Sequence, residues 1–359
     1  MTQNSTKHTD TSVPSDHSKN NTGVPHYGNI GAEYDAVRTS AGICDQSHRG
    51  KLKMTGMDRQ TFLHRVVTNN VQNLAVGEGV YACMLTPQGK IISDMAIYVR
   101  EEDILIDVTR IHVNILKETL ERYTVIDDVE INDITNDYGL IGVYGKDAII
   151  KLKDAYGAIE GLSQYGNVEI KSGPSSLTLV HSYRTGEDDY EIYSPIEQIG
   201  DIWETLTNLQ SPNPCTPVGM AAIEILRVEA GIPCSPAELN NLTIPNESVR
   251  ERAISFSKGC YIGQEPVVMM EHRGQPNRLL SGFVIEGTSL PERNCTIKQD
   301  GKDIGWITTA VYGRGIDSII ALGFIRRQFK QIGKRVTVLV DEQSVEAEIV
   351  DLPFYISNR

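Results

Sequence analysis

A short segment near residue 260 combines a single thiol with glycines and charged neighbours. Its residues, in order, are Lys258, Gly259, Cys260, Tyr261, Ile262, Gly263, Gln264 and Glu265. The two glycines permit positive φ angles and therefore a tight turn. A nearby ammonium or guanidinium group, from Lys258 or Arg273, would favour the thiolate, the form of cysteine that acts as nucleophile or metal ligand. Two interpretations of Cys260 stay open: a reactive thiol, or a small side chain that fills an apolar gap.

The length and composition are those of a globular protein with more than one domain. The chain has 359 residues, of which 40% are hydrophobic and 23% are charged, and this length allows two or three domains. The formal net charge of −13 argues against a nucleic-acid-binding surface, which would be basic. The six cysteines show no CxxC or other metal-ligand spacing, so we expect reduced thiols and no metal site.

The first 23 residues differ from the rest because they are almost entirely polar. Such a segment has too little apolar surface to fold, so residues 1–23 are predicted to be a disordered tail. The polar start does not resemble a secretion signal, and no apolar run reaches the roughly 20 residues that cross a membrane. We therefore expect a cytoplasmic protein with no membrane partner.

The elements that must position these residues change in character near residue 279. Before it, hydrophobic spacing predicts helices at 32–40, 58–69, 111–123, 146–155, 195–209 and 218–230. Strands are predicted at 51–55, 79–85, 91–99, 104–108, 139–144 and 177–183. After it, short alternating strands at 280–285, 296–299, 305–309, 319–324 and 335–339 are separated by Gly and Pro. This second pattern is typical of a small β-barrel or sandwich.

The 258–265 segment resembles the signature of the YgfZ-type folate-binding proteins, which assist iron–sulfur cluster assembly and repair. Those proteins share a superfamily with the glycine-cleavage aminomethyltransferases, or T-proteins. Other segments resemble the aminomethyltransferases themselves, and together the resemblance covers about residues 30–355. These segments are Gly42-Ile43-Cys44-Asp45-Gln46-Ser47-His48, Tyr81 to Asp94, Thr185 to Ile192, Leu226 to Gly231 and Pro353-Phe354-Tyr355.

The resemblance implies an α+β fold of the aminomethyltransferase type that binds tetrahydrofolate or a derivative. A folate-binding region of two interlocked α+β subdomains would span residues 24–278, and a C-terminal β-barrel would span 279–359. Four residues would line one folate cavity: Tyr81, Asp94, Glu191 and Arg227. Glu191 would accept two parallel N–H bonds from the pterin ring, which is a charge-compatible bidentate pair. The sequence departs from the family at two neighbouring positions, where Arg184 replaces a tyrosine and Asp189 replaces a glycine.

Three functions follow from the resemblance, and the first is favoured at this point. It is a tetrahydrofolate-binding, YgfZ-like protein that serves iron–sulfur client or assembly proteins through Cys260, because T-proteins typically have no cysteine in that loop. The second is a folate-dependent aminomethyltransferase, whose chemistry needs positioning and a carboxylate such as Asp94 but no thiol. The third is a folate-responsive scaffold without chemistry. We expect the Cys260 sulfur to be accessible from the cavity or its rim, close to Lys258 or Arg273.

Overall fold

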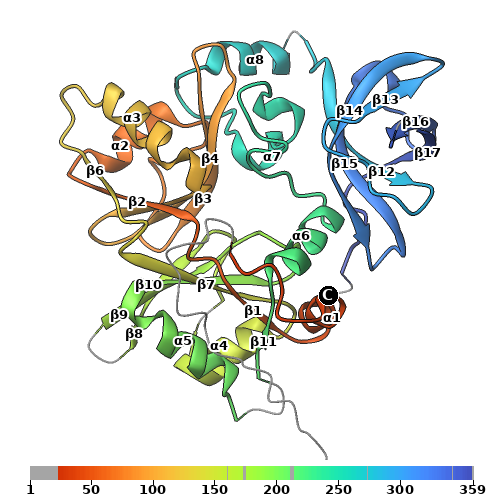
Figure 1. Cartoon of the computed structure of the whole chain (residues 1–359). Helices are drawn as coiled ribbons and strands as arrows, with labels where there is room; N and C mark the ends of the chain where they lie inside the picture. Colours follow the sequence, from red (N-terminus) through yellow and green to blue (C-terminus); the bar gives the residue numbers. More distant parts are fainter. Residues whose placement is uncertain are drawn as a thin grey trace, which may run out of the picture.

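The computed structural model describes residues 23–159, 161–172, 175–210, 214–272, 274–341 and 343–357. Residues 1–22, which belong to the predicted disordered tail, lie outside the described residues. The described chain forms two β-sheets with helices on their outer faces and a separate closed barrel (Figure 1). The predicted α+β class and the predicted C-terminal β-barrel are therefore confirmed.

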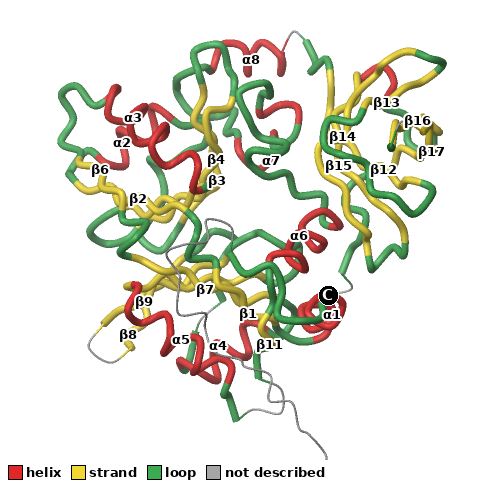
Figure 2. The backbone as a smooth tube through the Cα atoms, viewed as in Figure 1, coloured by secondary structure: helices red, strands yellow, loops and turns green. Residues whose placement is uncertain are grey.

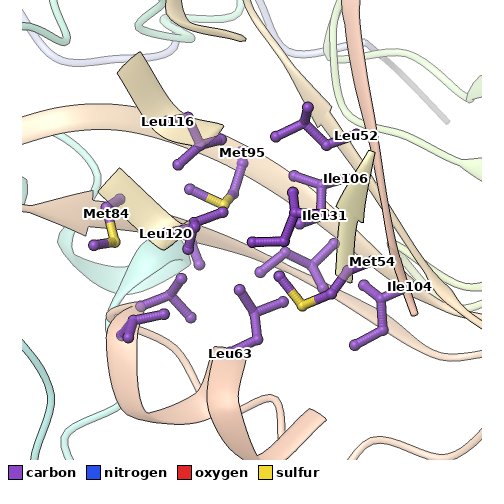
Figure 3. Packing of buried hydrophobic residues seen from close by; sticks show 14 of the residues in the cluster. Leu52, Met54, Leu63, Met84, Met95, Ile104, Ile106, Leu116, Leu120 and Ile131 are labelled. Atoms are coloured by element: carbon purple, nitrogen blue, oxygen red, sulfur yellow. The ribbon is translucent and has the colours of Figure 1, made fainter. Parts of the chain in front are cut away.

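The first sheet is antiparallel and is covered on its outer face by two helices. Its strand order is β3 (Gly79–Leu85), β4 (Ile91–Val99), β5 (Ile104–Val108), β2 (Gly50–Thr55) and β6 (Glu130–Asp133). The covering helices are α2 (Arg59–Val66) and α3 (Val113–Tyr123). Figure 3 shows the core between these helices and the sheet, in which Leu63, Leu116 and Leu120 pack against strand residues such as Met54 and Ile106. Burial of these apolar side chains determines which face of each strand packs on the helices, so the alternate residues face the other way.

The second sheet carries its helices on the opposite side of the molecule. Its strand order is β11 (Thr216–Pro217), β1 (Gly42–Asp45), β7 (Tyr138–Tyr144), β10 (Asp189–Pro195), β9 (Ser175–His181) and β8 (Asn167–Ser172). Helices α4 (Ala148–Tyr156) and α5 (Ile199–Thr207) share a core with the outer face of this sheet. A further core joins the inner faces of the two sheets, because it contains Tyr81 and Tyr98 of the first sheet and Leu140 and Tyr193 of the second.

The C-terminal strands close into a barrel. Its order is β12 (Arg278–Ile285), β15 (Ser318–Arg326), β14 (Lys302–Gly313), β13 (Thr296–Gln299), β16 (Arg335–Val340) and β17 (Gln343–Val350). Helix α6 (Met220–Glu229) packs against β14 and β15 on one side and against α1 (Ile30–Thr39) on another. Figure 2 shows α6 between the second sheet and the barrel.

Arg38, which is half-buried on α1, helps to fasten the segment that follows the barrel to the rest of the chain. Arg38 on α1 contacts the carboxylates of Glu187 and Glu229, and its guanidinium lies 4.0 Å from the ring centroid of Tyr355. The backbone N–H groups of Phe354 and Tyr355 donate to the Glu229 carbonyl at 2.8 and 3.1 Å. The segment that follows the barrel is therefore fastened to α1 and α6.

The loop around Cys260 differs most from the sequence-based expectation. Residues Gln264–His272 form helix α8, and a short helix, α7 (Arg250–Ala253), precedes the loop. Pro266 fits in the first turn of α8 because backbone N–H groups there have no intrahelical acceptor.

Strands β8 and β10 of the second sheet were not predicted. In β10, Asp189 and Glu191 occupy fully buried positions, where sequence patterns lead us to expect apolar residues. None of the described helices has the length and apolar character to cross a membrane.

Candidate active site

Strand alternation places polar side chains on the inner face of the first sheet. On β4, Met95, Ile97 and Val99 belong to the outer core, so Asp94 and Tyr98 take the opposite face. The same alternation directs Tyr81 on β3 and Asp107 on β5 inward, toward the second sheet. The sequence therefore builds a polar layer between two sheets whose outer faces are apolar.

A cavity of about 240 Å³ lies in this layer. Its wall comes from β3 and β4 of the first sheet, from the β1–β2 and β9–β10 connections, from α6 and from the segments around residues 109, 165, 232–235 and 252. The lining residues are Gln46, His48, Arg49, Tyr81, Asp94, Met95, Ala96, Tyr98, Thr109, Tyr165, Ser182, Tyr183, Arg184, Met220, Ile223, Glu224, Arg227, Ile232, Pro233, Cys234, Ser235 and Arg252. Three of the four predicted folate-site residues, Tyr81, Asp94 and Arg227, are thus brought together; Glu191 does not line the cavity.

The cavity wall carries polar atoms that the protein leaves without partners. The Tyr81 hydroxyl donates to Asp94 Oδ2 at 2.8 Å, whereas the buried Asp94 Oδ1 has no hydrogen-bond partner among the described residues. The same holds for His48 Nδ1, the Tyr98 hydroxyl and the Ser182 hydroxyl, which belong to the same wall. Because buried polar groups are normally hydrogen-bonded, this concentration in one cavity fits a polar ligand.

Arg252 adds a positive charge where this cavity meets a second one. Its guanidinium lies 4.2 Å from the ring centroid of Tyr81 and 5.1 Å from that of Tyr183. Within the described part of the chain no carboxylate forms a salt bridge with it. The second cavity, of about 460 Å³, also has Arg252 and Tyr183 in its wall and reaches Lys330 and Leu352 beside the barrel. The two spaces together can hold a ligand longer than the inner cavity alone.

Arg227 also lines the cavity, but its donors are used by the protein. It forms a bidentate pair with Glu224, with Nε–Oε2 and Nη2–Oε1 distances of 2.8 and 2.6 Å. Its Nη1 group lies 3.3 Å from Glu238 Oε2 and also donates to the Ile232 carbonyl. These contacts connect α6 to the segment that follows it, so Arg227 shapes the wall.

Glu191 lies behind Arg184, in the interior between the sheets. The carboxylate is fully buried, and Arg184 donates to both of its oxygens, from Nε to Oε1 at 2.9 Å and from Nη2 to Oε2 at 3.2 Å. The Tyr144 hydroxyl donates to Oε1 at 3.1 Å. Tyr144 reaches this position because Gly142 has no side chain: a Cβ there would lie 2.1 Å from the Tyr144 hydroxyl.

Asp107 completes a buried charge network that joins the two sheets. It accepts hydrogen bonds from Arg49 Nε at 2.9 and 3.0 Å, from Arg184 Nη2 at 2.8 Å and from the Tyr193 hydroxyl at 3.0 Å. Burial alone would raise the pKa of the Asp107 carboxyl, but the nearby Arg49 and Arg184 guanidinium groups hold this pKa well below its ordinary value. The network was not predicted, because Asp107 and Glu191 come from different sheets.

Asp189, at the position where the family has glycine, organises the loop that carries Arg184. Its Oδ2 atom accepts from the backbone N–H groups of Arg184 and Thr185 at 2.6 and 2.7 Å, and its other oxygen contacts the Thr185 hydroxyl. Burial raises the pKa of Asp189 to about 6, even though these hydrogen bonds favour the charged form. The two departures from the family pattern, Arg184 and Asp189, are therefore in direct contact.

The Cys260 loop lies outside the cavity wall. Cys260 is exposed, while its neighbour Tyr261 is 7% exposed and belongs to the core between the sheets. The sulfur is thus accessible, but Cys260 is not among the cavity-lining residues. Gly263 has a φ of +76°, and a Cβ at this position would lie 2.4 Å from the Thr86 carbonyl oxygen. Arg273, the second predicted cation, lies outside the described residues.

The rest of the predicted loop serves local structure. Gln264 and Glu265 form the first turn of α8, where an acidic residue is favoured by the helix dipole. A Cβ on Gly259 would meet no atom within 4 Å. Lys258 donates from Nζ to the backbone carbonyls of His64, Val67 and Asn69, at and beyond the C-terminal end of α2. Its ammonium group is therefore used to close this helix end.

We expect Lys258→Met to destabilise the protein by about 1–3 kcal/mol, because three carbonyls lose their shared donor. Urea unfolding followed by circular dichroism measures the change. Lys258→Arg is the matched control, since it keeps a cation with several N–H donors and should recover part of the loss. A methionine variant as stable as the unchanged protein would contradict this role.

The class of this protein is an α+β fold followed by a barrel. Two facing sheets enclose a polar cavity, and a closed six-stranded barrel follows them. Comparison with known proteins shows the same division: residues 14–258 match the family described as the GCVT N-terminal domain, and residues 278–355 match the glycine cleavage T-protein C-terminal barrel domain. The chain belongs to the glycine cleavage T-protein family. Members of this family use tetrahydrofolate as the acceptor of a one-carbon unit.

Individual relatives span nearly the whole chain. An aminomethyltransferase of Bacillus cytotoxicus is 30% identical over 336 residues, which cover 92% of this chain and 90% of the relative. One from Caldanaerobacter subterraneus is 29% identical over 336 residues, covering 91% and 88%. The crystal structure of aminomethyltransferase T from Bartonella henselae has the same fold, with a TM-score of 0.83 at 21% identity and coverage of 92% and 90%.

These comparisons confirm the superfamily part of the predicted resemblance and the aminomethyltransferase-like fold. They favour the second of the three functions, the aminomethyltransferase, over the iron–sulfur role that the Cys260 loop suggested. The resemblance to the YgfZ-type proteins is specific to eight residues of the loop, whereas the similarity to aminomethyltransferases extends over more than nine-tenths of the chain.

Proposed function

We propose that this protein is a folate-dependent aminomethyltransferase, which transfers a one-carbon unit from an aminomethyl donor to tetrahydrofolate. The observation that carries the proposal is the cavity between the sheets, where Asp94 leaves one carboxylate oxygen without a partner. The full-length similarity to aminomethyltransferases supports it. When bound, tetrahydrofolate would supply the amine nitrogen that receives the carbon.

The residues present fit such a ligand on the Asp94 side of the cavity. Tyr81 fixes Asp94 through its hydroxyl, so that Oδ1 keeps one orientation and can accept a hydrogen bond or steady a positive charge that develops nearby. Arg252, with no carboxylate partner in the described chain, lies where the inner cavity opens toward the barrel and suits an anionic end of the ligand. On the Glu191 side the fit fails, because Arg184 already occupies the carboxylate.

The iron–sulfur role remains a second candidate on one observation. Cys260 is the single exposed cysteine of the six, and it lies in the loop that resembles the YgfZ signature. The site chemistry separates the two candidates, because the aminomethyltransferase reaction would depend on Asp94 and not on Cys260.

A gene-deletion strain of the source organism tests the proposal. We expect the deletion to block growth on glycine as the source of one-carbon units and to leave the activity of iron–sulfur enzymes unchanged. The reverse outcome, loss of iron–sulfur enzyme activity with normal use of glycine, would overturn the proposed function.

In the same strain, we expect a gene encoding Cys260→Ser to restore growth on glycine to the level of the unchanged gene. The serine keeps the size and exposure of the side chain and removes only the thiol chemistry. Growth rate is the readout, and protein abundance measured by immunoblot serves as the control. Failure of a normally abundant serine variant would assign the thiol a role that an aminomethyltransferase does not need.

A further inference from the structure

The contact between Arg184 and Glu191 has the geometry by which a carboxylate recognises a guanidine. Two neighbouring nitrogens of Arg184 face the two oxygens of Glu191, at 2.9 and 3.2 Å. The pterin ring of a folate presents an equivalent edge, in which a ring N–H and the 2-amino group point the same way. A carboxylate that binds one of these groups in a bidentate manner can bind the other.

Arg184 stands between the cavity and this carboxylate. Arg184 belongs to the cavity wall, and its side chain is 23% exposed, whereas the Glu191 side chain is 0% exposed. A ligand in the cavity therefore meets the guanidinium first. Contact with Glu191 would require the Arg184 side chain to leave both Glu191 and Asp107.

The surroundings of Arg184 keep their own partners if its guanidinium is removed. Asp107 would keep the two contacts from Arg49 Nε and the hydroxyl of Tyr193. Glu191 would keep the Tyr144 hydroxyl on Oε1 and would have acceptor capacity left on both oxygens. Replacement of Arg184 thus makes the Glu191 carboxylate available to a ligand, while the remaining hydrogen bonds hold Glu191 and Asp107 in place.

We propose that Arg184 is an internal competitor of the pterin ring: it occupies Glu191 in place of the ligand, so that this chain binds reduced folates without a contact to Glu191. This inference rests on the proposed function and concerns the selectivity of the same cavity. Arg184, and not Glu191, then sets how strongly the cavity discriminates between a pterin and other ligands. Asp189 supports this arrangement because it holds the backbone of Arg184 in place.

A binding experiment with two ligands and a double-mutant cycle tests the proposal. The probes are 5-formyltetrahydrofolate, which has the pterin edge, and p-aminobenzoylglutamate, which lacks it; calorimetry gives both dissociation constants. We expect Arg184→Tyr to bind the reduced folate about tenfold more tightly or better, as one charge-assisted bidentate contact becomes available. Glu191→Gln should change the affinity by less than about twofold alone and should remove the gain in the Arg184→Tyr background. Affinity for p-aminobenzoylglutamate should stay the same throughout.

Arg184→Gln is a second variant that frees Glu191, to be used if the tyrosine variant folds poorly. Circular dichroism verifies the fold of each variant. The proposal is overturned if Glu191→Gln alone weakens folate binding as strongly as it does beside Arg184→Tyr, since the ligand would then displace Arg184 unaided. It is also overturned if neither Arg184 variant tightens binding. Absence of any reduced-folate binding, in the unchanged protein and in both variants, would overturn the proposed function together with this inference.

Discussion

Asp94→Asn is expected to reduce the folate-dependent release of ammonia from an aminomethyl donor by about 10²–10⁴-fold, the range for loss of a positioned charged group in an active site. Asparagine keeps the size of the side chain and can still accept the Tyr81 hydrogen bond that Asp94 accepts at 2.8 Å. The substitution removes the negative charge of the carboxylate, whose oxygen Oδ1, in the cavity wall, has no hydrogen-bond partner within the described part of the unchanged protein. The substitution therefore separates charge from packing.

Steady-state kinetics with purified protein measures this effect, and the loss should fall mainly on kcat, because the carboxylate is expected to act on charge that develops during the reaction. Asp35→Asn is a matched control: Asp35 lies on α1, its side chain is 58% exposed and it pairs with Arg314 at the surface. Equal activity of the Asp94 and Asp35 variants would remove Asp94 from the proposed site.

Asp107→Ala is expected to destabilise the fold by about 3–5 kcal/mol, the cost of removing one partner from a buried charge network. Asp107 is fully buried, and it contacts Arg49, Arg184 and Tyr193 together. Alanine would leave Arg49 without the carboxylate that it contacts through Nε and Nη2. Urea unfolding at neutral pH measures the difference.

The pH dependence of this loss follows from the depressed pKa of Asp107. A carboxyl group whose folded-state pKa lies below its unfolded value stabilises the fold above the unfolded pKa of about 4, and this contribution disappears as the pH falls toward the folded value. The difference between Asp107→Ala and the unchanged protein should therefore be largest near neutral pH and shrink below about pH 4. Glu346→Ala is the control, because its pair with Arg335 is exposed and the change should be barely measurable.

The strands of the first sheet could be predicted closely because their chemistry is local. The predicted ranges 79–85 and 91–99 coincide with β3 and β4, and the alternation along β4 places Asp94 and Met95 on opposite faces. The family resemblance implied that Tyr81 and Asp94 share one cavity, and a hydrogen bond of 2.8 Å joins them. Here hydrophobic pattern and turn residues determine structure within about twenty residues of chain.

The environment of Glu191 could not be predicted in the same way. Its partner Arg184 also contacts Asp107, which lies 77 positions before Arg184 and belongs to the other sheet. The sequence did carry one sign of this arrangement, the arginine at a position where the family has tyrosine. That this arginine contacts Glu191 as well as lining the cavity becomes visible only when the two sheets are placed face to face. The role of Lys258 could not be predicted for a similar reason, since its three carbonyl acceptors lie about 190 residues away in the sequence.

Helix α6 gives the barrel a mechanical connection to the cavity. One side of this helix contributes Ile223 and Arg227 to the cavity wall, while the helix also packs on β14. Thr309 on β14 is within 3.4 Å of Arg227 Nη2 and donates to Glu238 Oε1 at 2.7 Å. A displacement of the barrel would therefore reach the cavity wall through α6 and through the contacts of Thr309 with Arg227 and Glu238. By reciprocity, a ligand that shifts α6 would reorient the barrel and the protein surface that it presents.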